Sequence, residues 1–267
     1  MLRERVLAAI VLIPIVVLVG WLGGWWFTAF VAIFATVAAW ELFTMMGRND
    51  FYTPVLWLGL IIVALLILES GLQPANAERF QALLVLSILV GLTVALFLDR
   101  PHASTDWLIT LGGAVYLGMT LRYLSLMRAL DQGLWLLVIT AITVWMTDSG
   151  AYFIGKSFGR HKLWPRISPK KTWEGLFGGL FVGTLSAIAL TLWLIPGALW
   201  WQGAVIGVLA GIVGPLGDLS ESLFKRQVGA KDSSHLIPGH GGFFDRIDSF
   251  IFVGPVVYVV VHLWWGW

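Results

Sequence analysis

Long apolar stretches with almost no charge recur along nearly the whole chain. A helix needs about 20 largely apolar residues to cross about 30 Å of hydrocarbon, and it satisfies its own backbone groups there. Only 12% of the 267 residues are charged and 58% are hydrophobic, whereas an average soluble domain has about 25% charged residues. The sequence therefore predicts an all-α, polytopic integral membrane protein.

Nine segments meet the requirement for a transmembrane helix. They cover approximately residues 6–22, 25–44, 54–70, 81–98, 106–126, 133–155, 174–196, 198–216 and 249–266. Arg3 and Arg5 precede the first apolar run, as in a signal peptide. No clear cleavage site follows and a second span begins at once, so we expect an uncleaved helix.

The composition also excludes several function classes. With 16 Trp, 16 Phe and a net charge of +2, the chain is neither disordered nor a basic arm, and we expect no nucleic-acid partner. There is no cysteine, so disulfides, thiolate metal sites and cysteine nucleophiles are excluded.

The distribution of Lys and Arg between the loops predicts the orientation in the membrane. With nine spans and a cytoplasmic N-terminus, fourteen of the seventeen basic residues lie inside, and only Arg79, Arg122 and Arg128 lie outside. We therefore expect a cytoplasmic N-terminus and an extracytoplasmic C-terminus.

The two halves of the chain differ in their polar residues. Residues 1–132 have short polar connections and no reactive constellation, so we predict a scaffold of transmembrane helices. Residues 133–267 contain two polar segments, 156–173 and 217–248, which hold ten of the seventeen basic residues. We predict that residues 133–267 form the catalytic region and that both segments are cytoplasmic loops.

The first polar segment is strongly basic and follows an acidic residue within a span. Asp148 lies near the end of the sixth span, where an ionisable side chain either is solvated at the interface or faces a partner in a wet cavity. Pro169 can open a helix, which would leave free backbone N–H groups beside Lys170 and Lys171 and suit a phosphate. A loop that only contacts anionic headgroups explains the charge but not this arrangement.

The second polar segment combines acids with hydroxyls. If the stretch after the eighth span is helical, Asp218, Ser222 and Lys225 lie along one face. The same geometry puts Asp245 and Asp248 on one face at the start of the last span. Three converging carboxylates without cysteine make an all-oxygen site, which suits Mg²⁺ or Mn²⁺ rather than zinc.

Basic residues and glycines accompany these acids. Four cations are expected to bind the phosphates that a hard cation bridges: Lys225, Arg226, Lys231 and Arg246. Gly241 and Gly242 let the backbone approach a ligand, and His240 orients the turn or donates to a phosphate. A solvated amphipathic helix is the alternative, but it does not account for the clustered acids and glycines.

Residues 222–248 resemble the signature of the phosphatidate cytidylyltransferase, or CDP-diacylglycerol synthase, family. The matching pattern is Ser222-x-Phe224-Lys225-Arg226-x₄-Lys231-Asp232-x-Ser234-x₂-Ile237-Pro238-x-His240-Gly241-Gly242-Phe243-x-Asp245-Arg246-Ile247-Asp248. Asp148 to Tyr152 and Ser168 to Gly175 are also similar to blocks of that family, whereas the first 130 residues match only in being hydrophobic.

The resemblance implies that CTP and phosphatidate give CDP-diacylglycerol and pyrophosphate in phospholipid biosynthesis. It implies Mg²⁺ as cofactor, with a second cation left open, a homodimer, and a site on the cytoplasmic face of a bacterial inner membrane. A phosphate nucleophile is already ionised at neutral pH, so the step needs in-line positioning and charge neutralisation rather than a strong base.

The expected site residues fall into three groups. Metal ligands are Asp218, Asp245 and Asp248. The catalytic residues are these three together with Lys225 and Arg226. The substrate-binding residues are Asp148, Lys170, Lys171, Ser222, Lys231, His240, Gly241, Gly242 and Arg246.

Two rival functions remain open at this point. Another CTP-dependent lipid enzyme, such as a polyprenol or phytol kinase or a CDP-archaeol synthase, would share a basic, metal-bearing cytoplasmic face. A secondary transporter would require broken helices in two related halves, with charges near the midplane. The unlike halves and the one-sided polar clusters favour the enzyme.

Overall fold

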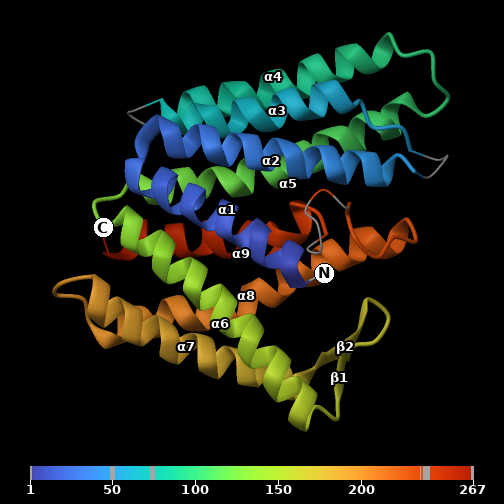
Figure 1. Ribbon diagram of the computed structural model, residues 1–267. Helices are drawn as coiled ribbons and strands as arrows, with labels where there is room; N and C mark the ends of the chain where they lie inside the picture. The colour runs from blue at the N-terminus through green and yellow to red at the C-terminus, as the bar shows by residue number, and fades with distance from the viewer. Residues whose placement is uncertain (1, 49–51, 73–75, 235, 237–240, 266–267) are drawn as a thin grey trace. The chain divides into compact units, whose positions relative to one another are not determined.

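The computed structural model describes residues 2–48, 52–72, 76–234, 236 and 241–265. Within these ranges the chain forms nine α-helices and one pair of short strands (Figure 1). The helices are α1 (Leu2–Leu22), α2 (Gly24–Met46), α3 (Leu56–Leu68), α4 (Ala77–Leu96), α5 (Ala103–Arg128), α6 (Gly133–Phe158), α7 (Trp173–Leu194), α8 (Trp200–Gln227) and α9 (Phe244–Val260). A 3₁₀ turn, Glu69–Gly71, follows α3, and a π-helical turn, Val261–Trp265, continues α9.

Each predicted apolar segment coincides with one of these helices. Among the described residues, six helices are long and apolar enough to cross a membrane: α2, α4, α6, α7, α8 and the continuous helix Phe244–Trp265. The prediction of a helical membrane protein is therefore confirmed. The count of nine spans and the orientation of the termini stay predictions.

The segment after α6 differs from the expected loop and helix. Strands β1 (Lys162–Trp164) and β2 (Ser168–Thr172) pair antiparallel, with Lys162 opposite Thr172. The expectation that Pro169 opens a helix is wrong, because Pro169 lies within β2, where a two-stranded hairpin tolerates its missing N–H. Helix α7 instead begins after Thr172, whose Oγ1 accepts a hydrogen bond from Gly175 N at 3.2 Å.

The eighth helix is also longer than predicted. The apolar run ends near residue 216, but α8 continues to Gln227. The polar residues from Asp218 to Gln227 are therefore helical. This is the condition under which Asp218, Ser222 and Lys225 lie along one face.

The chain forms two compact units. The first consists of Met1–Leu126 with Phe224–Arg246, and the second of Met127–Leu223 with Ile247–Trp267. The boundary between Leu126 and Met127 lies close to the predicted boundary between residues 132 and 133. The segment Phe224–Arg246, however, belongs with the N-terminal helices.

The first unit has an apolar interior that contains a buried ion pair between Arg122 and Glu69. Helices α2 and α3 pack so closely that a Cβ on Gly59 would overlap the Phe43 ring. Arg122 Nη2 lies 2.8 Å from Glu69 Oε2, and its guanidinium group lies over the Phe80 ring. This arrangement pairs two charges that would be costly to bury singly.

In the second unit, small residues let α6 and α7 pack along their length (Figure 1). A Cβ on Gly178 would lie 2.5 Å from Ile154 Cδ1, and one on Gly179 would lie 2.6 Å from the Thr147 carbonyl oxygen. Such contacts between small residues are typical of helix pairs in membranes. The pairing fixes the end of α6 beside the hairpin and the start of α7.

Candidate active site

Three carboxylates of the second unit lie close together. Asp218 and Glu221 are one turn apart on α8, and Asp248 lies near the start of α9. One carboxylate oxygen from each lies within 4.8 Å of the others. Glu221 is only 1% exposed, while Asp218 and Asp248 are partly buried. We call these three residues the acidic cluster.

The contact between α8 and α9 that forms this cluster depends on Gly217. A Cβ on Gly217 would lie 3.0 Å from the carbonyl carbon of Asp248 and 3.1 Å from Ser249 Cα. Only a residue without a side chain allows this approach. The backbones therefore meet directly beside Asp218, which brings its carboxylate within reach of Asp248.

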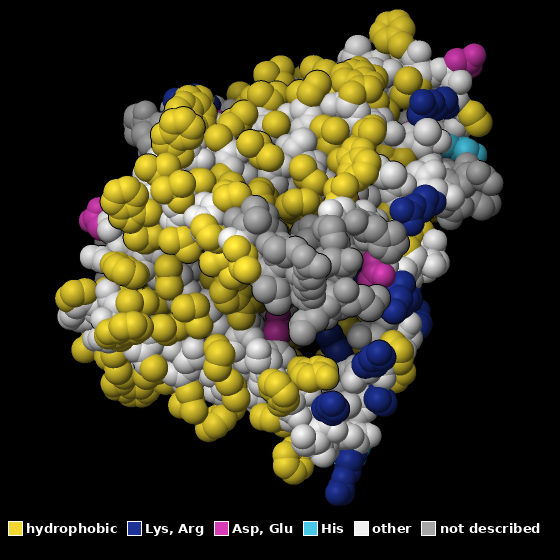
Figure 2. Space-filling view, in the orientation of Figure 1, with side chains coloured by type: hydrophobic (Ala, Val, Ile, Leu, Met, Phe, Trp, Pro, Cys, Tyr) yellow, Lys and Arg dark blue, Asp and Glu magenta, His cyan; other side chains and the backbone are white. Residues whose placement is uncertain are grey.

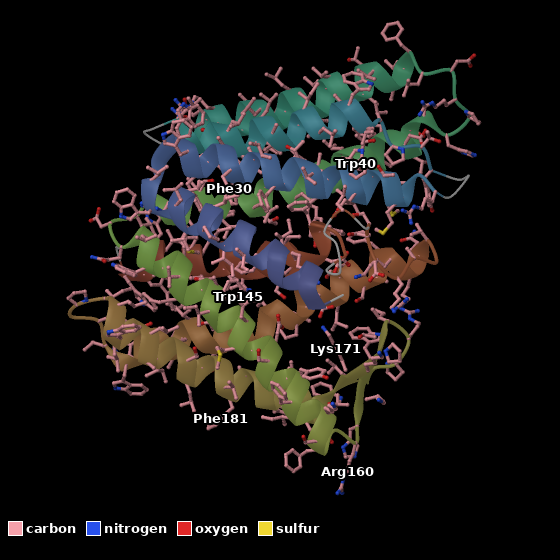
Figure 3. The ribbon with its side chains drawn as sticks, viewed as in Figure 1. Phe30, Trp40, Trp145, Arg160, Lys171 and Phe181 are labelled. Atoms are coloured by element: carbon pink, nitrogen blue, oxygen red, sulfur yellow. The ribbon has the colours of Figure 1, made fainter. Side chains whose placement is uncertain are left out.

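Other charged and polar groups of the same unit contact the cluster, among them Lys171, which Figure 3 labels. Lys171 Nζ on β2 lies 2.7 Å from Asp218 Oδ2, and Ser222 Oγ donates to Asp218 Oδ1 at 3.4 Å. Asp148 on α6 interacts electrostatically with Asp218 and Asp248. Residues from α6, β2, α8 and α9 thus meet at one site.

The donor set of the acidic cluster fits a hard divalent cation. Mg²⁺ and Ca²⁺ take oxygen ligands at about 2.0–2.6 Å, so oxygens within 4.8 Å of one another can share one ion. The carboxylates of Asp218 and Asp248 repel each other, and Lys171 neutralises only one negative charge. A bound cation would relieve that repulsion.

Asp245, the remaining predicted metal ligand, lies in the first unit and has other described partners. Its carboxylate accepts hydrogen bonds from Lys225 Nζ at 2.7 Å, Ser233 Oγ at 2.6 Å and Gly242 N at 2.8 Å. These contacts stabilise the turn before α9. The metal role of Asp245 stays a prediction, and the cluster contains Glu221 instead.

Glu221 was missed by sequence analysis, although a signal for it existed. It follows Asp218 by three residues, which places both on one face of a helix. The sequence prediction grouped Asp218 with Ser222 and Lys225 and did not include Glu221.

Glu41 on α2 was also missed. It is 1% exposed, and its carboxylate accepts hydrogen bonds from Phe243 N at 3.1 Å and Phe244 N at 2.8 Å. The hydroxyl of Ser234 donates to it as well, and Ser233 Oγ lies 3.2 Å from it. A carboxylate at the N-terminus of α9 satisfies backbone donors that the helix leaves free. A helix assigned to the scaffold therefore contacts Ser234 and the start of α9, both within the segment that resembles the family signature.

The other predicted site residues are distributed as follows. On the hairpin, Lys170 is exposed. In the first unit, Arg226, Lys231 and Arg246 are exposed, while Gly241 has φ +79° and Gly242 is buried. His240 lies outside the described residues.

The second unit carries many of its basic side chains near the hairpin. Lys156, Arg160, Lys162, Arg166 and Lys170 are exposed, and Lys and Arg gather at this end in the space-filling view (Figure 2). Hydrophobic side chains cover much of the remaining visible face (Figure 2). An acidic cluster beside basic side chains on an apolar helical protein is typical of a membrane enzyme that acts on phosphate compounds.

Comparison with known proteins defines the family. Residues 3–264 match the family model of the Cytidylyltransferase family. The chain belongs to this family and is an enzyme, which confirms the resemblance found in the sequence.

Its relatives align over nearly their whole length. The phosphatidate cytidylyltransferase of Bacillus subtilis is 37% identical over 267 residues, covering 97% of this chain and 95% of the relative. The protein of the same name from Staphylococcus haemolyticus is 31% identical over 260 residues, covering 97% and 99%. That of Staphylococcus aureus is 32% identical over 256 residues, covering 96% of each.

Proposed function

We propose that this protein transfers CMP from CTP to phosphatidate, giving CDP-diacylglycerol and pyrophosphate. Family membership and the near full-length relatives named phosphatidate cytidylyltransferase support this reaction. The observation that carries the proposed site is the acidic cluster with Lys171 against Asp218 at 2.7 Å. Such a site suits a polyphosphate substrate, which needs both a cation and fixed positive side chains.

In this proposal, Asp218, Glu221 and Asp248 hold a divalent cation, and Mg²⁺ suits their oxygen donors. When bound, the cation supplies charge neutralisation at the triphosphate. Asp148 lies near enough to the cluster to interact with it electrostatically, so we assign it to the nucleotide side of the site.

The side chains then have to position two phosphates rather than remove a proton. An ionised oxygen of phosphatidate attacks the α-phosphorus of CTP and forms the new P–O bond. The bond to the β-phosphate breaks, and its electron pair leaves with pyrophosphate. Lys171 orients and neutralises a substrate phosphate, and the exposed cations of the hairpin raise the local concentration of anionic substrates.

We also propose that the protein lies in a bacterial inner membrane and that its active site faces the cytoplasm. The exposed basic residues around the hairpin favour the cytoplasmic face by the positive-inside rule. With nine spans this gives a cytoplasmic N-terminus and an extracytoplasmic C-terminus. A homodimer, which the family resemblance implies, completes the proposal.

Purified protein incubated with CTP, phosphatidate and Mg²⁺ tests the reaction. We expect equal amounts of pyrophosphate and CDP-lipid, and CTP labelled at the α-phosphate should transfer its label to the lipid. Transfer from the γ-phosphate would instead identify a lipid kinase. Substrate flux into proteoliposomes without nucleotide turnover would identify a transporter.

A further inference from the structure

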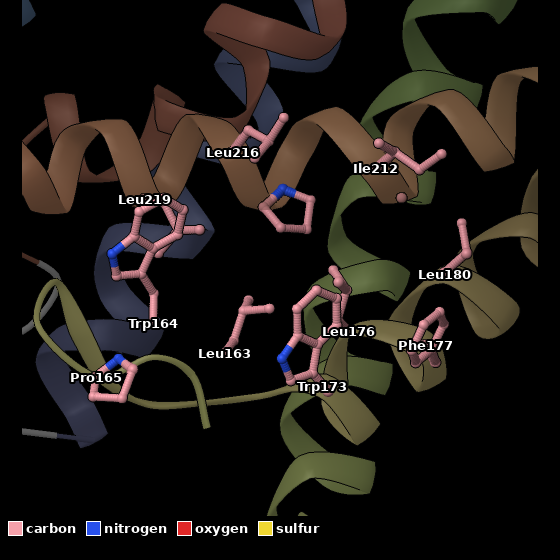
Figure 4. Close-up of a pocket in the computed structure, with 12 residues that line it drawn as sticks. Leu163, Trp164, Pro165, Trp173, Leu176, Phe177, Leu180, Ile212, Leu216 and Leu219 are labelled. Atoms are coloured by element: carbon pink, nitrogen blue, oxygen red, sulfur yellow. The ribbon is translucent and has the colours of Figure 1, made fainter. Parts of the chain in front are cut away.

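An apolar pocket of 690 Å³ lies within the second unit, between the hairpin, α7 and α8 (Figure 4). All its lining side chains are apolar; they include Trp164 on β1, Trp173 and Phe177 on α7, and Ile212 and Leu216 on α8. No role has been given to this pocket by the proposed chemistry.

One end of the pocket adjoins the proposed site. The lining residue Leu219 directly follows Asp218, and Trp173 comes two residues after Lys171. The side chains of Lys171 and Asp218 are themselves in contact at 2.7 Å. The strand and the helix that supply Lys171 and Asp218 therefore lead directly into the lining at this end of the pocket.

The pocket extends from this end along both helices. On α7 its lining runs from Trp173 to Leu180, and on α8 from Leu219 back to Gly211. At 1.5 Å per helical residue these stretches are about 10–12 Å long. A Cβ on Gly211 would lie 2.6 Å from Leu180 Cδ1, so the helices touch at the far end. The lining therefore follows both helices over this length, along which an extended hydrocarbon chain can lie.

The charge of the hairpin and the apolar lining of the pocket together indicate which ligand the pocket binds. The hairpin that contributes Trp164 also carries exposed Lys162, Arg166 and Lys170, which complement an anionic headgroup. The lining of the pocket itself offers only apolar contact. A lipid phosphate with an attached hydrocarbon chain matches both the basic hairpin and the apolar pocket, whereas a nucleotide matches only the hairpin.

We infer that this pocket binds an acyl chain of phosphatidate, with the lipid phosphate at Lys171. The inference rests on the proposed function, because it locates the lipid substrate of that reaction. Burial of the chain in the pocket holds the phosphate beside the acidic cluster and adds binding energy remote from the reacting atoms.

Filling the pocket tests this inference. Ile212→Trp places an indole in the pocket, and Val208→Trp is the matched control one turn earlier on α8. The two residues are 50% and 39% exposed, and only Ile212 lines the pocket. We expect Ile212→Trp to raise the KM for dioleoyl phosphatidate about tenfold, because it displaces a few buried methylene groups. The KM for dihexanoyl phosphatidate and for CTP should stay within about twofold.

A second pair of variants keeps the test valid if Ile212→Trp does not fold. Phe177→Ala removes a lining side chain, and Phe181→Ala removes its neighbour one turn later on α7 (Figures 3 and 4). They are 61% and 64% exposed, so any general effect of losing a lipid-facing ring is shared. Only Phe177→Ala should weaken the preference for the long-chain substrate.

Photo-crosslinking identifies the lipid in the pocket. Phosphatidate with a diazirine near the end of one chain should label residues that line the pocket, and dioleoyl phosphatidate should compete. Equal labelling by the matching phosphatidylcholine, or equal kinetic effects within both variant pairs, would overturn the inference. Absence of CDP-lipid from wild-type protein with either chain length would instead refute the proposed function.

Discussion

The backbone carbonyl of Asp248 lies against Gly217, so α8 and α9 touch at the residue that precedes Asp218. The acidic cluster is therefore formed by a backbone contact and not by long side chains reaching across a gap. Small changes in the spacing of these two helices should change the distances between the carboxylates.

Gly217→Ala should reduce turnover by about 10²-fold, because a misplacement of about 1 Å at a site can cost that much. Overpacking should also lower the free energy of unfolding by about 1–3 kcal/mol. Gly214→Ala is the matched control on the same helix, since its Cβ would meet Val253 Cγ2 at an ordinary 3.5 Å. CDP-lipid formation and thermal unfolding in detergent measure both effects. Equal activity of the two variants would contradict the role of Gly217.

Glu221→Gln should weaken the apparent affinity of the enzyme for Mg²⁺. Loss of one carboxylate ligand removes charge from a three-carboxylate site, so the Mg²⁺ concentration for half-maximal turnover should rise by at least about tenfold. Asp248→Asn should abolish product formation while the protein remains folded in detergent. The exposed Asp131→Asn serves as a charge-matched control. A Glu221→Gln enzyme with an unchanged Mg²⁺ titration would exclude Glu221 from the metal site.

Lys171 and Lys170 are adjacent but should differ in effect. Lys171 contacts Asp218 at 2.7 Å, whereas Lys170 is exposed on the same strand. Lys171→Gln should lower kcat/KM for phosphatidate by about 10–10³-fold, the range for losing a charged group at a transferring phosphate. Lys170→Gln should change it by less than about threefold, because a screened surface charge contributes little. Steady-state kinetics with varied phosphatidate distinguish the two, and equal losses would show that Lys171 has no special position.

Glu41→Gln should destabilise the first unit and disturb the signature segment. The carboxylate accepts hydrogen bonds from Ser234 Oγ, Phe243 N and Phe244 N, whereas an amide offers one acceptor oxygen and points N–H groups at donors. We expect a loss of about 2–4 kcal/mol in the free energy of unfolding, as for a buried charged acceptor. Glu78→Gln, at an exposed position in α4, should change it by less than about 0.5 kcal/mol. Thermal unfolding of both variants in detergent measures the difference.

The predicted orientation can be measured because the chain has no cysteine. A membrane-impermeant maleimide should label Asp131→Cys in intact cells and Ser157→Cys only after permeabilisation. Asp131 precedes α6 and Ser157 lies in its last turn, and both are exposed. The reverse labelling pattern would invert the proposed topology and place the hairpin outside.

The positions of the helices could be predicted because the hydrocarbon thickness sets the length of each apolar run. The C-terminal end of α8 could not be predicted from the length of its apolar run. Composition marks where the lipid-facing surface ends near residue 216, but the helical hydrogen bonds continue through Asp218 and Glu221 to Gln227. The hairpin was missed for a related reason, since Pro169 is compatible with both a helix start and an edge strand.

The site was predictable only where its residues are neighbours in the sequence. Helical spacing identified Asp218 with Ser222, and it would have identified Glu221. A single sequence gives no signal for the pairing of Glu41 with Phe243 and Phe244, because these partners lie about 200 residues away. The approach of Gly217 to Asp248 likewise depends on how two helices pack.

The reach of Glu41 to Phe244 also has a consequence for biosynthesis. Helix α2 is synthesised early. The backbone N–H group of Phe244, which donates a hydrogen bond to the buried Glu41 carboxylate, is synthesised near the end of translation. Until then an acidic side chain in an apolar helix has to stay hydrated or protonated, since an uncompensated charge at that depth is costly. Nascent chains that stop before α9 should therefore retain a buried carboxylate without these backbone donors.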